Sequence, residues 1–420
     1  MTQNQSSTPL ESEYPTLRPV DIYPVHHNGQ QSICLRDPQN IAKNILILPL
    51  PAFFLVSLFD GKHSILDIQE SFMRQFQQLA PRKNIEEMIA QLDRELFLET
   101  NRFRQALDKI KEDFRAAPIR EAAHAGTAYD ADPASLRERL SGFMQDAAVK
   151  AENRVTAAER LTALIAPHID IQRGGLCFAQ AYRELARHKP SDLYVIFGTA
   201  HQSRSSLFAA TAKSYATPLG AIETDADFVE RFSREAPVDV FAEEVLHRDE
   251  HSIEFQAVWL RFVLGENWRG KMVPILCGSF HPFVQSGRSP REDANMAETL
   301  DLLQSLIKEY PGTVTVIAGA DMSHVGKRFG SERGIPDSEL DRVKREDEEV
   351  LEAMISGDAE AFYRCVEKNK DRNNLCGLSP IYMTLDVARP PVGRLLKYDR
   401  AIERDSESVV TFASASFYDR

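Results

Sequence analysis

The stretch LTALIAPHID, residues 161–170, is a short apolar run that ends at a proline and is followed by His168 and Asp170. An apolar run of this length is typical of a buried strand in an α/β sheet. His168 would then stand at the carboxyl end of the strand, where open α/β sheets carry their ligand sites. This strand end is therefore the first place to expect both the sheet and a functional site.

The same arrangement recurs further along the chain. Three more short apolar runs are each followed by a histidine, which is hard to obtain by chance at four strand ends. Further apolar runs at 207–210 and 409–417, with helix-patterned stretches between several of the strands, predict an α/β fold. The three recurring runs and the residues after them are 193–197 with His201, 272–276 with Cys277 and His281, and 314–317 with Asp321 and His324.

The composition limits the possible classes of protein. The chain has 420 residues, which suggests two domains, or three at most, at roughly 150 residues each. Apolar residues make up 43% and charged residues 27%, which excludes a long disordered, collagen-like or disulfide-stapled chain. The net charge of −12 disfavours broad attraction to nucleic acid or to an anionic membrane.

The cysteines and the apolar segments predict a cytoplasmic protein. The five cysteines are odd in number, scattered and without a C-x-x-C pair, which fits a reducing compartment. The first residues lack the basic and apolar parts of a secretory signal. The most apolar window, Ile45–Phe59, contains two prolines and is shorter than the roughly 20 residues that span a bilayer.

Residues 1–110 are expected to form a small α+β domain of their own. Ser64 with Asp67 predicts a capping box at the start of one helix, and Asn84 with Glu87 predicts a second. A short strand expected at 96–99 would complete a helical bundle with a β-wing.

The hinge between the two parts is expected just before Pro118. Residues 111–117 end in Ala116-Ala117 and are taken as the linker. The second domain would then span residues 118–420.

The residues at the strand ends predict a transition-metal site. Imidazole, carboxylate and thiolate side chains bind such metals, and two histidines with one anionic ligand leave positions open for substrate or oxygen. Cys376 precedes Gly377, which is expected to open a helix and so lower the pKa of the thiol. Spacing alone leaves the anionic ligand open among Asp170, Asp321, Glu250 and a cysteine.

A second interpretation comes from His247-Arg248-Asp249-Glu250-His251. This segment matches H-x-x-E-H, the inverted zinc-protease pattern, in which one helix presents two histidines and a glutamate serves as general base. The alternative is that Glu250 and His251 stand at a helix start, where Glu250 favours the positive end of the dipole and His251 orients a neighbouring ligand.

Taken in order, these segments resemble the Memo family, whose bacterial members are also called AmmeMemoRadiSam system protein B. The likeness covers about residues 118–418, and ordered matches over this length are far more specific than a five-residue pattern. The motifs that carry it are His124-Ala125-Gly126 with Tyr129, Ala166-Pro167-His168, Phe197-Gly198-Thr199-Ala200-His201, Asp249-Glu250-His251-Ser252-Ile253-Glu254, Gly319-Ala320-Asp321-Met322-Ser323-His324, Cys376-Gly377 and Phe412-Ala413-Ser414-Ala415.

The resemblance implies a fold like that of class III extradiol dioxygenases, a mixed α/β sheet flanked by helices with a metal pocket at one edge. It implies His168, His201 and Cys376 as metal ligands. The pocket would also be lined by Asp321, His324, Glu250 and His251.

This chain departs from the related patterns at the third ligand. The ring-cleaving enzymes use a carboxylate where the family pattern has Cys376. Many relatives have Ala-Gly after the first histidine, whereas this chain has Ile169-Asp170. If the strand continued, Asp170 would lie on the same side as His168 and restore a carboxylate.

The N-terminal domain resembles the PqqD-like winged-helix peptide-chaperone domains, through Asp60-Gly61, the helix that follows Ser64 and the helix over 85–98. Residues 1–110 carry 11 Lys and Arg against 13 Asp and Glu, so the sequence gives little support to DNA binding. A peptide or protein partner is expected, or else a helical cap that only packs on the second domain.

Three functions follow. The first is a metal-dependent redox enzyme for a small-molecule or peptide substrate, with Fe(II) favoured by the resemblance, copper or zinc open, and His324 or His251 exchanging protons. The second is a non-catalytic adaptor, since the bacterial family name implies a link to a radical S-adenosylmethionine (radical-SAM) protein and an Ammecr-type partner. The third is the zinc protease.

Overall fold

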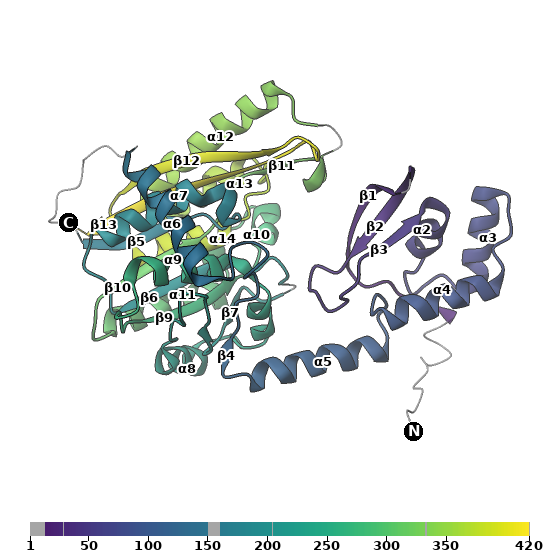
Figure 1. Ribbon diagram of the computed structural model, residues 1–420, viewed down its shortest axis with the longest axis horizontal. Helices are drawn as coiled ribbons and strands as arrows, with labels where there is room; N and C mark the ends of the chain where they lie inside the picture. The colour runs from purple at the N-terminus through teal and green to yellow at the C-terminus, as the bar shows by residue number, and fades with distance from the viewer. Residues whose placement is uncertain (1–12, 28, 150–159, 204, 332–333, 420) are drawn as a thin grey trace. The chain divides into compact units, whose positions relative to one another are not determined.

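The computed structural model describes residues 13–27, 29–149, 160–203, 205–331 and 334–419. The chain divides into two compact units, Met1–Ala117 and Pro118–Arg420. Figure 1 labels the elements of both units. In the part of the chain that is described, no helix combines the length and the apolar character needed to cross a bilayer.

The first unit is a three-stranded antiparallel sheet followed by four helices. Its strands pair in the order β1-β2-β3, and its helices bury an apolar core of their own that includes Ile68, Ile89 and Phe97. The elements are β1 (Asp21–His27), β2 (Gln30–Arg36), β3 (Leu46–Pro49), α2 (Leu50–Ser57), α3 (Ile65–Phe76), α4 (Arg82–Arg94) and α5 (Asn101–Ala116).

The local signals of this unit were only partly predictive. Ser64 and Asp67 form the expected capping box at the start of α3. The second predicted box is wrong, because α4 begins at Arg82 behind Pro81 and takes in Asn84 as an interior residue.

Two further expectations for this unit need correction. The strand expected at 96–99 is reduced to a single bridge between Leu98 and Leu17. The segment 111–116, taken as part of a linker, forms the last turns of α5. Residues 21–36, for which no strand was expected, form two of the three strands.

The second unit is an α/β domain built on a mixed eight-stranded sheet, as predicted. The strand order is β11-β13-β5-β10-β6-β9-β7, with β12 paired to β13. The central strands β5, β10, β6 and β9 are parallel, whereas β13 and β7 join them antiparallel. The elements are β4 (Ile119–Arg120), α6 (Pro133–Val149), β5 (Arg160–Ala166), α7 (Ile171–Ala186), β6 (Leu193–Thr199), β7 (Phe208–Ala210), β8 (Ser214–Tyr215), α8 (Ala226–Glu235), η1 (Glu244–Arg248), α9 (His251–Leu264), β9 (Lys271–Cys277), α10 (His281–Ser286), η2 (Pro290–Glu292), α11 (Ala294–Glu309), β10 (Val314–Gly319), β11 (His324–Gly326), η3 (Lys327–Phe329), α12 (Asp337–Ile355), α13 (Ala359–Lys368), α14 (Leu378–Ala388), β12 (Gly393–Glu403) and β13 (Ser408–Asp419).

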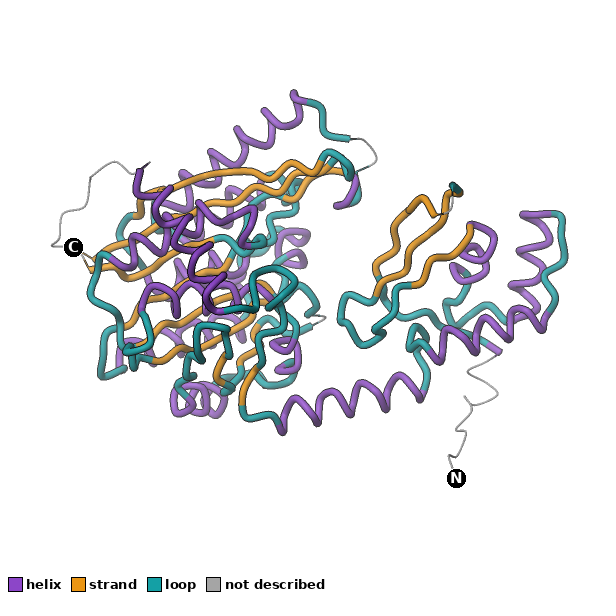
Figure 2. The backbone as a smooth tube through the Cα atoms, in the orientation of Figure 1, coloured by secondary structure: helices purple, strands orange, loops and turns teal. Residues whose placement is uncertain are grey.

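Helices cover both faces of this sheet (Figure 2), and the central strands β5, β6, β9 and β10 bury side chains on both faces. Along β5, Ala163 and Ile165 pack into one core with α11 and α14, whereas Leu164 and Ala166 pack into another with α7 and α9. Burial on both sides explains why the strands read as continuous apolar runs in the sequence.

The carboxyl ends of three neighbouring strands meet at one edge of the sheet. Gly319, the last residue of β10, pairs with Ala166 of β5 on one side and with Gly198 of β6 on the other. The loops that follow these strands therefore begin side by side, as expected for a parallel sheet.

The first turn of α9 packs directly on these strand ends because two of them are glycines. A Cβ atom on Gly198 would lie 2.5 Å from the Ser252 hydroxyl oxygen, and one on Gly319 would lie 2.4 Å from the Ser252 carbonyl oxygen. Gln256 fastens the helix by donating from Nε2 to the carbonyl oxygen of Pro167 at 2.8 Å. Any larger residue at these strand ends would push the helix away.

We predict that Gly319→Ala destabilises the protein. The added methyl group meets backbone, which cannot swing aside, and overpacking of this kind costs about 1–3 kcal/mol. Gly142→Ala is the matched control, because Gly142 lies exposed within α6 with nothing near its Cβ position, and Ala there should gain about 0.5–1 kcal/mol. Urea unfolding of the two variants measures the difference; equal stabilities would contradict the close packing of α9.

Candidate metal centre

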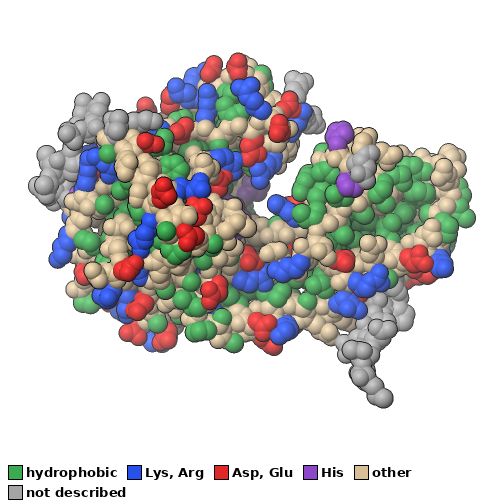
Figure 3. All heavy atoms as spheres, in the orientation of Figure 1, with side chains coloured by type: hydrophobic (Ala, Val, Ile, Leu, Met, Phe, Trp, Pro, Cys, Tyr) green, Lys and Arg blue, Asp and Glu red, His purple; other side chains and the backbone are tan. Residues whose placement is uncertain are grey.

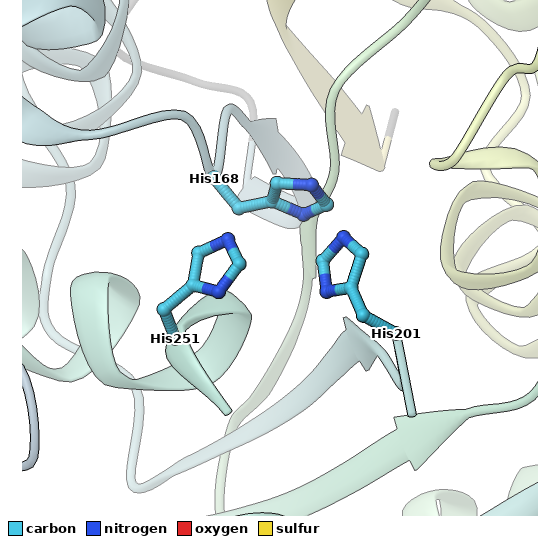
Figure 4. Close-up of side chains that lie close together, drawn as sticks. All are labelled: His168, His201 and His251. Carbon is cyan, nitrogen blue, oxygen red and sulfur yellow. The ribbon is translucent and has the colours of Figure 1, made fainter. Parts of the chain in front are cut away.

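Three imidazoles come together at the edge of the sheet. His168 follows β5, His201 follows β6, and His251 is the first residue of α9. One possible ligand atom from each lies within 4.8 Å of the others, and the ring centroids are 4.9 to 5.3 Å apart. Figure 4 shows the three rings gathered around one small region. The expectation that His168 and His201 meet is thus satisfied, and a third histidine joins them.

The tautomer of His168 is set by a backbone carbonyl. Its Nδ1 lies 2.9 Å from the carbonyl oxygen of Gly319, which can only accept, so Nδ1 carries the proton and Nε2 keeps its lone pair. The ring is buried, and burial holds its pKa well below the usual value. His168 is therefore a neutral imidazole with one nitrogen available to a metal.

Glu250 sets the other two rings. Its carboxylate lies 3.0 Å from Nδ1 of His201 and 3.1 Å from Nδ1 of His251. Accepting both protons leaves Nε2 of each ring with its lone pair, the arrangement by which a carboxylate orients histidine ligands. The two rings stack with only 13° between their planes.

The same carboxylate caps α9, and its charge is firmly held. Glu250 also accepts from the backbone N–H groups of His251 and Ser252 at 2.8 and 3.0 Å. Burial opposes its ionisation, yet His201 and His251 outweigh burial and hold the pKa of Glu250 well below its usual value. In return, although burial favours neutral His201, the charge of Glu250 raises the pKa of that imidazole.

Cys376 lies next to this cluster, against His168. Its Sγ is 3.2 Å from Nε2 of His168, so the cysteine expected as a ligand lies beside one of the three imidazoles. The expected lowering of its pKa is wrong: α14 does begin just after it, at Leu378, but burial and the charge of Asp321 raise the pKa of the thiol well above its usual value. Cys376 is therefore a protonated thiol that donates to His168.

Asp321 approaches His168 from another side. Its Oδ1 accepts from the backbone N–H of His168 at 2.9 Å, and its Oδ2 lies 3.7 Å from Nε2 of the same residue. Burial raises the pKa of this carboxyl group.

His324 is the first residue of β11, directly after the loop that carries Asp321. Its Nδ1 donates to the carbonyl oxygen of Met322 at 3.1 Å. Burial lowers its pKa to about 4, although the charge of Asp321 partly offsets this. The loop is held by the buried Asp347, which accepts the neighbouring Ser323 hydroxyl at 2.6 Å.

Two residues that the sequence placed at strand ends lie outside the cluster. Asp170 caps α7 by accepting from the backbone N–H of Arg173 at 3.0 Å and forms an ion pair with that side chain. The strand does not continue past Ala166, so the argument that turned Asp170 toward the metal fails. His281 is exposed at the start of α10.

The zinc-protease interpretation is contradicted by the backbone. His247 lies in the short helix η1, the chain turns at Asp249 and Glu250, and only His251 belongs to α9. His247 is buried with both ring nitrogens engaged, at 2.6 Å from the Tyr215 hydroxyl and 2.8 Å from the carbonyl oxygen of Ala209. The two histidines therefore do not form one site.

Sequence reasoning placed His251 in the lining of the pocket, but it did not group its ring with those of His168 and His201 as a possible third ligand. It identified the residue and its place at a helix start, but assigned it to orienting ligands or to proton exchange. The missing signal was Glu250, whose one carboxylate holds both His201 and His251.

Comparison with known proteins agrees with the motifs. The family model for Memo-like protein matches residues 120–416. A MEMO1 family protein of Aquifex aeolicus is 25% identical over 96% of this chain and all of the relative. Those of Methanopyrus kandleri and Methanosarcina mazei are 28% and 26% identical over 71% and 70% of this chain, and over 98% of each relative. Because the match covers well over half of the sequence, this protein belongs to the Memo family.

Proposed function

We propose that this protein is a metal-dependent redox enzyme whose metal is held by His168, His201 and His251. The observation that carries the proposal is the state of the three rings: each has an oxygen acceptor at Nδ1, which leaves three Nε2 lone pairs for one ion. Three imidazoles with an open position are a common donor set of catalytic metal sites. The buried, neutral state of His168 fits such a role.

We propose Fe(II) as the metal, with copper or zinc as the alternatives that the test must separate. Imidazole suits all three metals, and a nearby thiol such as Cys376 favours the softer ones. When bound, the metal would supply a Lewis acid and, for iron or copper, a one-electron redox couple.

The residues around the cluster would position substrate and move protons. His324 is neutral near pH 7 because its pKa lies at about 4, so its unprotonated Nε2 can accept a hydrogen bond from substrate. Burial raises the pKa of the Asp321 carboxyl group, which suits this group to exchange a proton with substrate. Of these two residues, Asp321 lies directly against His168.

The open side of the cluster indicates where a small-molecule or peptide substrate would enter. The side chains of His201 and His251 are 31% and 32% exposed, whereas that of His168 is 2% exposed. Substrate would therefore approach over the stacked pair, with His168 at the floor of the site.

A second proposal concerns protein partners. It is supported by the first unit, which has its own core and displays apolar side chains. Figure 3 shows hydrophobic groups gathered on the visible face of this unit. Such groups favour protein or peptide contacts. The partner class we propose is a radical-SAM or Ammecr-type protein. The compartment we propose is a reducing cytoplasm, which suits five free cysteines. The exposed large apolar residues of the unit are Tyr14, Ile22, Tyr23, Ile45, Ile47, Leu50, Leu66, Met73 and Leu79.

We predict that His168→Ala, His201→Ala and His251→Ala each abolish stoichiometric metal in protein purified without oxygen. Each substitution removes one of three donors, so elemental analysis should find well under one ion per chain. Asp170→Asn is the matched control and should retain the metal, because its partner is Arg173. Full occupancy in the His168 and His201 variants would end the proposal, and full occupancy in His251→Ala alone would return the third position to Cys376.

We predict that Glu250→Gln weakens Zn(II) binding by about 10–100-fold, the usual cost of losing a carboxylate behind histidine ligands. The amide keeps the shape but has one acceptor fewer and no charge. Asp225→Asn is the control, since Asp225 also caps a helix, α8, in a buried position. Competition with a chromophoric chelator measures both affinities; similar values would show that Glu250 does not act through the imidazoles.

The pH dependence of Zn(II) binding should report on His201. Because Glu250 raises the pKa of this imidazole, the ring keeps a second proton, on Nε2, to a higher pH than an ordinary histidine. That proton excludes a metal, so affinity falls as pH falls through the raised pKa. In Glu250→Gln the midpoint should move to lower pH, measured by titration calorimetry at a series of pH values. A midpoint that does not move would contradict the coupling.

A further inference from the structure

The segment from Arg120 to Tyr129 is docked onto α9 by one buried carboxylate. Glu254 accepts from the Arg120 guanidinium, from the backbone N–H groups of Ala123 and His124 at 3.1 and 2.9 Å, and from the Tyr129 hydroxyl. The side chains of Arg120 and Glu254 are 0% exposed. A buried charge with this many donors is costly to separate from its partners, so the segment is fixed relative to α9.

The same anchor restrains the turn that leads into α9. Arg120 donates from Nε to the carbonyl oxygen of His247 at 2.7 Å and from Nη2 to that of Glu250 at 2.8 Å. One guanidinium thereby ties both ends of this turn to the docked segment.

His124 extends from this segment to the third imidazole of the metal centre. Its Nε2 donates to the carbonyl oxygen of Asp249 at 2.9 Å, in the middle of the turn that Arg120 holds. Its ring meets the His251 ring with 5.7 Å between centroids and 77° between planes, and meets that of Phe255 at 5.9 Å. The His251 ring thus contacts the rings of His201, Phe255 and His124.

We infer that His124 is a positioning residue of the metal centre, which holds His251 in the orientation that a metal requires. It acts through two contacts, the hydrogen bond to Asp249 and the edge-to-face ring contact with His251. It does not belong to the group whose ligand atoms lie together. The inference rests on the proposed function, because it assumes that His251 binds the metal, and it assigns a role to a motif that the site itself did not explain.

The two contacts can be removed separately. His124→Gln keeps a donor that reaches about as far as Nε2 but loses the ring. His124→Phe keeps an aromatic ring against His251 but loses the donor. His124→Ala loses both. His188→Ala is the matched control, because His188 is a partly buried histidine whose hydrogen bond is to Glu184, away from the centre.

The test is Co(II) binding to the full chain, read by chelator competition and by the visible spectrum of the bound ion. We expect His124→Ala to bind Co(II) about 10–100-fold more weakly than the wild type, with an altered spectrum. His124→Gln and His124→Phe should each recover part of the affinity, and His188→Ala should match the wild type. The thermal midpoints of the metal-free variants show whether each chain is folded, and if the Ala variant is not, Gln and Phe carry the comparison.

Two results would overturn the inference. Wild-type affinity and spectrum in all three His124 variants would show that His124 does not position His251. Loss as great in Gln and Phe as in Ala, in folded protein, would make His124 a ligand instead of a positioning residue. Failure of the proposed function looks different: Co(II) binding would then survive His168→Ala and His201→Ala, whereas survival in His251→Ala alone would return the third position to Cys376.

Discussion

The candidate metal centre depends on the burial of one carboxylate, that of Glu250. A buried negative charge is tolerated only where donors surround it, and here the donors are the N-terminal N–H groups of α9 and the Nδ1–H groups of two imidazoles. The helix start favours the anion through its dipole, and the anion fixes the tautomer of His201 and His251. The structural cap and the chemical orientation are therefore the same interaction, and neither can be altered alone.

That carboxylate reaches both rings only because the helix lies unusually close to the sheet. Gly319 is the last residue of β10 and Gly198 the last but one of β6, and a side chain at either position would strike the first turn of α9. The carbonyl oxygen of Gly319 in turn receives the Nδ1 proton of His168. Glycine at these two positions thus permits the close packing of α9. At Gly319 the backbone carbonyl group also orients His168, the one ring that Glu250 does not hold.

Features that depend on local pattern could be predicted from the sequence, and features that depend on where the chain turns could not. The apolar runs gave the parallel strands, and the histidines after β5 and β6 gave two of the three rings. Asp170 was misplaced because the two-residue alternation assumes a strand, whereas the chain turns into α7 at that residue. The H-x-x-E-H pattern misled for a similar reason, because the turn at Asp249 separates its two histidines. The raised pKa of Cys376 could not be predicted from the sequence, because it results from burial in the packed core. This burial outweighs the lowering of the pKa expected from the helix start.

The two candidate third ligands, His251 and Cys376, both lie against His168. They differ in whether binding a metal requires the loss of a proton. His251 keeps its own proton on Nδ1 with Glu250, so it can bind through Nε2 without releasing one. The Cys376 thiol points its hydrogen at the His168 lone pair that a metal needs, so it must either turn away or bind as a thiolate and release that proton. Because burial raises the pKa of this thiol, only an ion that binds sulfur strongly can displace its proton. In the proposed site a soft ion such as Cu(I) would therefore favour the set that includes Cys376, whereas a harder ion such as Fe(II) would favour the three imidazoles. In the proposed site the third ligand would therefore depend on the metal, with His168 and His201 common to both sets.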